Sequence, residues 1–342
     1  MKDTIYTQNR ELSWLRFNER VLEEAREKNV PAFEKLKFIS IFTSNLDEFF
    51  MIRVGSLYDQ TFLSKPQIDN KTGMDAAEQL SEIFRAVAPL YKKRDKIYRE
   101  VAGLLCEKGI AHPQMESLTA EERSFAEKYF IADVLPVLSP QIINAHHPFP
   151  HLVNKALYIV LQMKISDKTA YGIIPMPAMQ DRLIFLPGSG MRYVLLEELI
   201  YQYAERVFDN CEINAKSIIC VTRNADINVD DLPDEDEDFR HHMKKVLRKR
   251  SRLAPVRLEH CGPIHDKLEK FLRGKLELKK EQVFQSSAPL EMSYVFPLLD
   301  KVPDRIRQAV TYVPFEPQVP PWFKTGDSMI DKVMQEDLIL SY

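Results

Sequence analysis

Histidine is the side chain most often used as a metal ligand in proteins, and this sequence places three of its eight histidines close together. His146, His147 and His151 lie in a segment that also contains Pro148 and Pro150. The spacing of His147 and His151 would let both imidazoles bind one metal ion if the segment were helical, but the prolines disfavour a helix there. We therefore expect packing or loop hydrogen bonding, with a metal site as the alternative.

A second histidine pair, His241 and His242, stands between two blocks of charge. Residues 230–238 contain seven acids, and residues 240–252 contain seven bases. Such blocks usually form a solvated helix face on which the charges compensate each other. The basic block could also contact an anionic polymer, although the neighbouring acids would compete for its cations. No local Ser/His/Asp or Cys/His arrangement supports nucleophilic catalysis.

Asn45 belongs to a polar group inside a very apolar segment. Residues 43–48 read Thr-Ser-Asn-Leu-Asp-Glu, and a polar side chain in such a setting must find hydrogen bonds or face a cleft. An asparagine amide carries both a donor and an acceptor, which suits the edge of an adenine base. The alternative is that residues 44–48 are simply the exposed stripe of a helix.

The acids beside Asn45 lack a basic partner on the same helix face. The residues four positions after Asp47 and Glu48 are Met51 and Ile52, so neither acid can form the usual helical ion pair. Arg53 is the nearest base ahead. It could meet either acid only through a bend or by way of another element.

Apolar residues at helical spacing predict two helices before residue 60. The first covers Leu12 to Leu22, and Pro31 marks the start of the second, which is apolar on most sides over residues 33–52. Gly55 and the polar stretch 64–73 should interrupt the pattern.

A third helix is predicted over residues 74–108. Pro89 lies inside it and should kink or interrupt it, and Gly109 is a plausible C-cap. Three long helices joined by short connections make residues 1–108 an up-down-up three-helix bundle.

Beyond residue 109 the pattern becomes mixed. Short apolar runs bounded by proline or glycine predict strands, while helical spacing returns at two places. The predicted strands cover 157–165, 171–174, 182–186, 192–195, 217–222 and 256–259, and the predicted helices cover 196–208 and 263–275. Residues 109–312 are therefore expected to form an α+β domain.

Residues 313–321 contain four prolines, as a linker does. The remaining residues 322–342 are too few to bury a core alone, and residues 338–340 resemble the opening of a strand. We therefore expect the chain to be the front part of a longer protein that is cut at the start of a third domain.

Composition narrows the class of protein. The 342 residues carry 47 Lys and Arg against 50 Asp and Glu, a net charge of −3, which argues against a generic nucleic-acid binder but leaves room for a local basic groove. The sequence has no apolar run of membrane-spanning length, no signal-peptide core, no GxGxxG and no P-loop. Cys106, Cys211, Cys220 and Cys261 are widely spaced and read as reduced thiols, so we expect a cytoplasmic protein.

Several segments spread along essentially the whole chain form a recognisable set. The longest is Leu36–Val54, LKFISIFTSNLDEFFMIRV. The others are RELSWLRFN at 10–18, RVLEEA at 20–25, LPVLSP at 135–140, HPFP at 147–150, VTRNAD at 221–226 and VRLE at 256–259. In this order they resemble the segments of the long-chain polyphosphate kinase family, also called polyphosphate kinase 1.

The resemblance implies a four-part protein with a helical bundle, a head domain and two C-terminal domains of phospholipase-D-like fold. On this interpretation residues 1–108 are the bundle, 109–312 the α+β head, 313–321 a Pro-rich linker and 322–342 the start of a truncated C-terminal catalytic domain. The head is implied to contribute to a homodimer or a higher homo-oligomer.

The implied activity is transfer of the γ-phosphoryl group of ATP to a histidine and then to a growing polyphosphate chain, with Mg²⁺. In the family the catalytic histidines and the magnesium site lie in the C-terminal domains, and none of the eight histidines here matches their motifs. No catalytic residue or metal ligand is therefore assigned in this chain, which is expected to be inactive alone.

Asn45 resembles a family ATP contact and is the one predicted site residue. The implied partners are ATP, ADP and inorganic polyphosphate, with no nucleic acid. The alternative function is a non-catalytic module for nucleotide binding, polyphosphate binding or dimerisation.

Overall fold

A computed structural model describes most of the chain. The described residues are 7–144, 147–165, 168–188, 190–208, 211–224, 253–316, 323, 326 and 328–339. Contacts divide the chain into two compact units, residues 1–311 and residues 312–342. The charged blocks at 230–252, with His241 and His242, lie outside the described residues.

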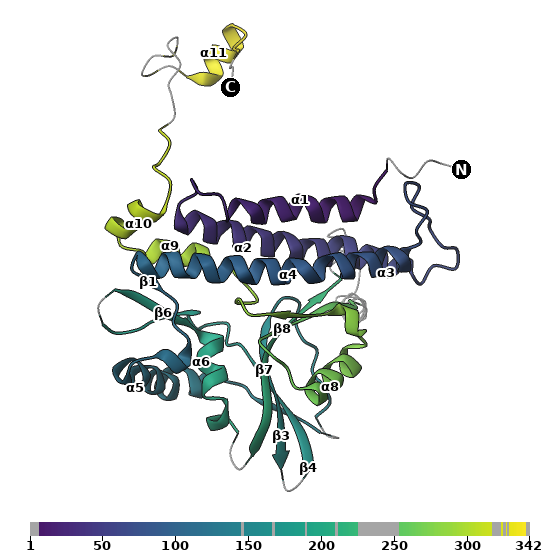
Figure 1. The fold of residues 1–342 in the computed structure, drawn as a ribbon, viewed down its shortest axis with the longest axis vertical. Coiled ribbons are helices and arrows are strands. Elements are labelled where there is room, and N and C mark those ends of the chain that lie inside the picture. The colour runs from purple at the N-terminus through teal and green to yellow at the C-terminus, as the bar shows by residue number, and fades with distance from the viewer. Residues whose placement is uncertain are drawn as a thin grey trace, which may run out of the picture. The chain divides into compact units, whose positions relative to one another are not determined.

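Three long helices lie side by side in the first unit, as predicted (Figure 1). They are α1 (Arg10–Glu24), α2 (Ala32–Phe49) and α4 (Ala76–Glu107). Local chemistry places their starts: the Asn9 side chain accepts from two backbone N–H groups of α1, and α2 begins directly after Pro31. Asp75 and Glu78 form a capping box at the start of α4.

Two predicted interruptions of helices are wrong. Pro89 does not interrupt α4, which continues as one helix through it, because tertiary packing can outweigh the lost hydrogen bond. Gly55 also does not end the second helix, which passes through a π-helical turn at Phe50–Val54 into α3 (Gly55–Gln60). A Cβ at Gly55 would lie 2.4 Å from Oδ1 of Asn224, so glycine is needed here for close packing. Gly109 follows Lys108, the C-cap residue of α4, with φ +89°, which confirms its predicted capping role.

A six-stranded sheet forms the centre of the head. Its order is β2 (Gln141–Ile143), β4 (Lys168–Pro175), β3 (Leu157–Ile165), β7 (Glu212–Arg223), β8 (Pro255–Cys261) and β9 (Val283–Ser286). Among the described strands of this larger sheet, the β8–β9 pair is parallel and the other pairs are antiparallel. A smaller sheet has the order β1 (Ile110–Ala111), β6 (Met191–Leu195) and β5 (Leu183–Phe185). The six predicted strands are confirmed, with bounds that differ by a few residues.

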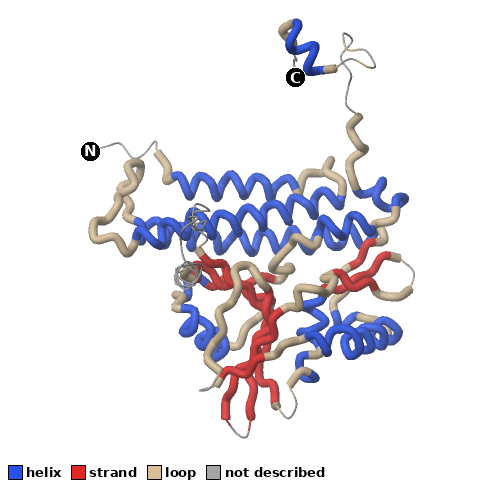
Figure 2. The backbone as a smooth tube through the Cα atoms, turned by 180° about the vertical axis from the view of Figure 1, so that it is seen from behind, coloured by secondary structure: helices blue, strands red, loops and turns tan. Residues whose placement is uncertain are grey.

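Alternate residues of β3 supply two separate cores, because successive side chains of a strand point to opposite faces. Tyr158 and Val160 pack with α8 (Asp266–Leu276), whereas Ile159 and Leu161 pack with α6 (Leu196–Gln202) and α5 (Ala120–Tyr129). Helices thus cover both faces of the sheet, and the three long helices lie across one end of it (Figure 2).

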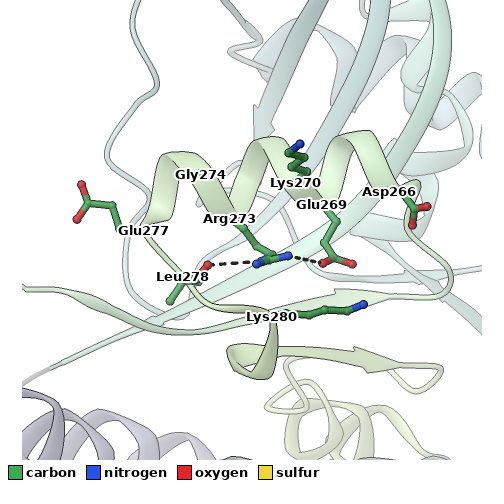
Figure 3. A pocket seen from close by; sticks show the side chains of 8 residues that line it. All are labelled: Asp266, Glu269, Lys270, Arg273, Gly274, Glu277, Leu278 and Lys280. Atoms are coloured by element: carbon green, nitrogen blue, oxygen red, sulfur yellow. Dashed lines mark hydrogen bonds and ion pairs between the residues drawn. The ribbon is translucent and has the colours of Figure 1, made fainter. Parts of the chain in front are cut away.

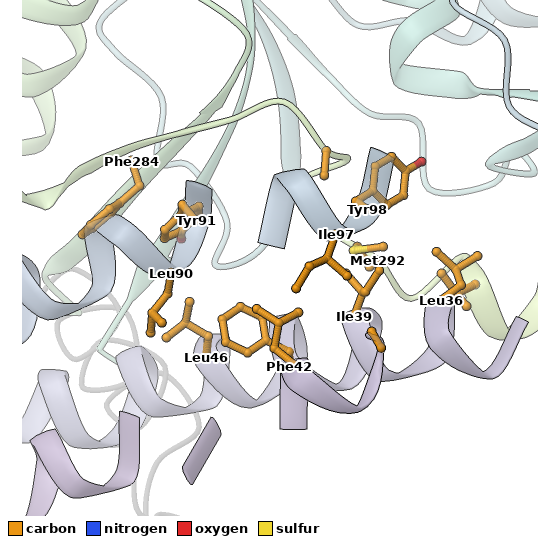
Figure 4. Packing of buried hydrophobic residues seen from close by; sticks show 14 of the residues in the cluster. Leu36, Ile39, Phe42, Leu46, Leu90, Tyr91, Ile97, Tyr98, Phe284 and Met292 are labelled. Atoms are coloured by element: carbon orange, nitrogen blue, oxygen red, sulfur yellow. The ribbon is translucent and has the colours of Figure 1, made fainter. Parts of the chain in front are cut away.

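The bundle core is completed by segments from far along the chain. Figure 4 shows Phe42 and Leu46 of α2 facing Leu90 of α4, with Phe284 and Met292 packed beside them. The last two come from β9 and from the loop before α9 (Val295–Lys301). α9 and α10 (Asp304–Val310) contribute further buried residues to the same core. The predicted division at residue 108 falls directly after α4 and stays a prediction.

The described residues of the second unit include the short helix α11 (Met329–Gln335). The segment expected to open a strand has no strand assigned at Leu338 and Ile339, and Leu340 lies outside the described residues. A strand requires a hydrogen-bonded neighbour, and no described segment pairs with these two residues.

Candidate functional site

Asn45 lies near the C-terminal end of α2 and lines a pocket between α1 and α2. The pocket has a volume of about 310 Å³, at the lower end of the range for small-molecule sites. Its lining residues are Trp14, Phe17, Asn45, Glu48, Phe49, Ile52 and Arg53. Asn45 is half-buried, while Ser44 and Glu48 are exposed and Asp47 is buried. Residues 44–48 are therefore not a simple exposed stripe, and Asn45 faces a cavity.

Aromatic side chains form the apolar part of this pocket. The rings of Trp14 and Phe49 are stacked, with centroids 4.5 Å apart and planes 9° apart. Phe17 and Ile52 are 48% and 47% exposed, although apolar side chains of this size are usually buried. A flat aromatic ligand can therefore pack against exposed apolar side chains next to a polar amide.

Asn45 is held in place by a hydrogen bond to Asn18, which is itself hydrogen-bonded to the backbone of α2. Its Nδ2 donates to Oδ1 of Asn18 over 3.1 Å, and Nδ2 of Asn18 donates to the backbone carbonyl of Phe42 over 3.1 Å. Asn18 is fully buried on α1, so α1 fixes the amide that α2 presents. Sequence analysis did not single out Asn18, although an asparagine among the apolar residues of a predicted helix was an available signal.

The rim of the pocket carries one acid and one base. Glu48 forms no ion pair with any residue in the described part of the chain, and Arg53 lies 4.0 Å from Glu11 of α1. The side chain of Arg53 is 42% exposed, so its charge remains available to an anionic group. Arg53, the nearest base ahead of Asp47 and Glu48, pairs with neither acid in the part of the chain that the structure describes.

Asp47 faces away from the pocket and contacts the head. Its carboxylate forms an ion pair with Arg257 of β8, and its second oxygen lies 3.2 Å from Nζ of Lys155. Lys155 adopts a left-handed backbone with φ +61°, which is uncommon for a side chain of this kind. The sequence did not predict these partners, because they lie more than a hundred residues from Asp47.

Arg257 is the centre of a buried polar network between α2, α4 and β8. It is 1% exposed and lies 3.0 Å from the Glu259 carboxylate, which accepts from the Tyr91 hydroxyl over 2.6 Å. It also donates to the Thr222 hydroxyl over 2.7 Å. Burial alone would lower the pKa of Arg257, but Glu259, Tyr91 and Asp47 raise it above its ordinary value. Burial raises the pKa of Glu259, and Arg257 partly opposes that rise.

The histidines singled out in the sequence do not form a site in the described part of the chain. His147 is exposed, and its backbone N–H donates to Oδ1 of Asn144 over 2.9 Å, as expected for loop hydrogen bonding. His146 is not described, and His151 has its own interactions. The described residues contain no group of three or more His, Cys, Asp or Glu side chains placed to hold a metal ion. Cys106, Cys220 and Cys261 are thiols, as predicted.

A second pocket runs along α8 and has a volume of about 540 Å³ (Figure 3). Its side chains are mostly charged, and the charges of the two signs balance. Arg273, at its centre, donates to Glu269 and to the carbonyl of Leu278, each over 3.4 Å. Lys270 and Lys280 line the same pocket as Asp266 and Glu277. With three acids against three bases, the pocket has little net positive charge for a polyanion, so the Asn45 pocket is the better candidate for a ligand site.

No helix among the described residues is both long and apolar enough to cross a bilayer.

Two family models match this chain in succession. A model described as the polyphosphate kinase N-terminal domain matches residues 7–112, and one described as the polyphosphate kinase middle domain matches residues 121–298. These matches agree with the predicted order of a helical part followed by an α+β head.

Curated relatives and a solved structure are also similar to it. A polyphosphate kinase of Bacillus cereus is 36% identical over 353 residues, which cover 100% of this chain and 50% of the relative. A polyphosphate kinase of Halalkalibacterium halodurans is 34% identical over 349 residues, covering 100% of this chain and 49% of the relative. A crystal structure of polyphosphate kinase from Porphyromonas gingivalis has the same fold, with a TM-score of 0.72 and 23% identity over 92% of this chain and 43% of that one. The chain thus spans about half the length of the curated relatives it matches.

Proposed function

The chain belongs to the polyphosphate kinase family, and on that premise we propose that it is the N-terminal portion of an enzyme that transfers the γ-phosphoryl group of ATP to inorganic polyphosphate. The proposed role of this portion is to supply one wall of the ATP site. The observation that carries the proposal is the position of Asn45 in a pocket with stacked aromatic side chains, within a chain that matches two polyphosphate kinase models.

The pocket suits the base of the nucleotide. A purine ring can pack against the exposed faces of Phe17 and Ile52, while the Asn45 amide hydrogen-bonds its edge. Arg53 at the rim can attract the negatively charged phosphates. Asn45 acts in this scheme by binding and orienting ATP, and it takes no part in bond making.

The phosphoryl transfer itself is proposed to run through a phosphohistidine formed in another part of the full-length protein, with Mg²⁺ bound there. Covalent catalysis of this kind divides one difficult transfer into two easier ones. The described residues hold no three-ligand cluster for a metal ion, so we assign Mg²⁺ to no residue of this chain. We further propose that the full-length protein is a cytoplasmic homodimer or higher homo-oligomer, with the head contributing to its contacts.

An ATP titration by calorimetry on the 342-residue chain tests the nucleotide site. Asn45→Ala removes one neutral hydrogen bond worth about 0.5–1.5 kcal/mol, so the Kd for ATP should rise roughly 2- to 13-fold. Ser44→Ala is the matched control, because Ser44 is the exposed neighbour on the same helix and does not line the pocket. An unchanged Kd in the Asn45 variant would contradict the proposed role.

The same protein tests the location of the nucleophile. When the chain is incubated with Mg²⁺ and γ-³²P-labelled ATP, we expect no acid-labile phosphohistidine above background. Labelling of this chain would show that the nucleophile lies within it.

A further inference from the structure

The hydrogen bonds that lead to Asn45 determine which of its two amide atoms faces Asn18 and which is left for a ligand. Asn18 begins this chain of bonds with its side chain fully buried, and its Nδ2 donates to the carbonyl of Phe42 over 3.1 Å. A backbone carbonyl can only accept a hydrogen bond. The nitrogen of the Asn18 amide must therefore face Phe42, and its oxygen must face Asn45.

The orientation of Asn45 follows from that of Asn18. Oδ1 of Asn18 carries no hydrogen, so Asn45 must present Nδ2 to it, and the two atoms are 3.1 Å apart. Oδ1 of Asn45 then points away from Asn18. Among the residues that the structure describes, no side chain donates a hydrogen bond to this oxygen. Asn45 lines the pocket, so the oxygen left without a protein donor is the hydrogen-bond acceptor that Asn45 can offer a ligand there.

We propose that Asn18 is a positioning residue that makes the Asn45 pocket select a base with an exocyclic amine over a base with a carbonyl at the same place. This inference rests on the proposed nucleotide site. The amine at position 6 of adenine can donate to Oδ1 of Asn45. The carbonyl at position 6 of hypoxanthine or guanine brings a second acceptor to that oxygen, which leaves both groups without a hydrogen bond.

An unrestrained asparagine would not discriminate in this way. Rotation of its amide by 180° exchanges the donor and the acceptor at almost no steric cost, so a free Asn45 could serve either base. The bond to Asn18 prevents this rotation, because a turned Asn45 would place its oxygen against the oxygen of Asn18. The buried residue on α1 thus sets the specificity of a residue on α2 that it contacts.

The first test needs no variant. ATP, purine riboside triphosphate and ITP differ at position 6 by an amine, a hydrogen and a carbonyl, and each is titrated into the 342-residue chain by calorimetry. We expect affinity to fall in that order, with ITP at least about fivefold weaker than ATP, the scale of one unmade hydrogen bond. Equal affinities for ATP and ITP would overturn the role of Asn18 and leave the nucleotide site intact.

Two variants then test the positioning role. Asn18→Leu removes the acceptor that fixes Asn45, so the ratio of the ITP and ATP dissociation constants should fall to within about twofold. Asn18→Asp is the conservative rescue, since a buried, protonated carboxyl can donate to the Phe42 carbonyl and still accept from Asn45. It should keep the wild-type ratio. A wild-type ratio in Asn18→Leu would overturn the proposal.

The results distinguish failure of the proposed nucleotide site from failure of the positioning role of Asn18. Thermal melting identifies any variant that does not fold, and in that case the three-nucleotide series on the wild-type chain decides. ATP binding that depends on Asn45, together with selection against ITP, supports both the site and the positioning role. Failure of the wild-type chain to bind ATP would overturn the nucleotide site, and with it the role of Asn18.

Discussion

Replacing Arg257 by methionine removes the only guanidinium that joins α2 to β8 in the described part of the chain. Arg257 is 1% exposed and forms ion pairs with Asp47 and Glu259. Methionine keeps a flexible, unbranched apolar stem but carries no charge. The variant would leave two buried carboxylates, with Lys155 3.2 Å from Asp47 and the Tyr91 hydroxyl 2.6 Å from Glu259 as their main remaining partners.

The expected loss of stability is large. Breaking a buried ion pair by removing one partner costs about 3–5 kcal/mol. Because Lys155 and Tyr91 still contact the two carboxylates, we expect a value near the lower limit, about 3 kcal/mol. The matched control is Arg85→Met, since Arg85 pairs with Glu82 on the surface, where the two side chains are 71% and 40% exposed. That change should cost less than about 1 kcal/mol.

The pH dependence gives the prediction a second, independent readout. Burial already raises the pKa of Glu259 while Arg257 opposes the rise, so removing Arg257 should raise it further. A carboxyl whose folded pKa lies above its unfolded value of about 4.3 destabilises the fold at higher pH, and the penalty fades as pH falls through the folded pKa. The difference between wild type and variant should therefore be larger at pH 8 than at pH 5.

Urea unfolding followed by tryptophan fluorescence measures both quantities. Wild type, Arg257→Met and Arg85→Met are compared by their midpoints and slopes at the two pH values. A loss below about 1 kcal/mol for Arg257→Met at pH 8, or a loss that does not shrink at pH 5, would refute the view that a buried charge network holds these elements together.

Two further predictions concern packing and a buried histidine. Gly55→Ala should destabilise the chain by about 1–3 kcal/mol, because the added Cβ would lie 2.4 Å from Oδ1 of Asn224. Gly103→Ala, where nothing lies within 4 Å of the added Cβ, should instead stabilise α4 by roughly 0.5–1 kcal/mol, and equal shifts of the urea midpoint would contradict this. Burial alone would lower the pKa of His112, but the Glu198 carboxylate 2.8 Å away raises it overall. The stability from this ion pair should be complete below about pH 6.5 and lost as pH rises through the raised pKa, so His112→Gln should flatten the melting temperature between pH 6 and pH 8.5, and an unchanged profile would refute the pairing.

The elements predicted correctly from the sequence each carry a strong local signal. The second helix begins directly after Pro31, and the mostly apolar run 157–165 is one of the two middle strands of the larger sheet. The missed helix α5 had a readable start, because Thr119 and Glu122 form a capping box. The four-residue strand Val283–Ser286 has no comparable signal, since a strand that short is specified by its neighbours.

The site shows the same division between local and long-range information. Asn45 could be singled out because its polarity contrasts with adjacent residues in the sequence. Its orientation depends on Asn18, which contacts it only because α1 packs on α2. The partner of Asp47 is 210 positions away, so no spacing rule for one helix could find it. From the sequence alone, the glycine at position 55 predicts a helix break. Its actual role depends on residue 224, whose side chain occupies the space that a Cβ would need.

The contribution of late segments to the bundle core has a consequence for synthesis on the ribosome. Ser40 of α2 hydrogen-bonds to the carbonyl of Met292, 252 positions later, and the same core includes Val310. The three long helices are complete when residue 107 has been made, but their apolar surface stays partly uncovered until the segment up to residue 310 emerges. At a synthesis rate of about 5–20 residues per second, that interval is roughly 10–40 s. During this time the nascent chain presents an apolar helical surface that a chaperone can bind, and α9 and α10 later take its place.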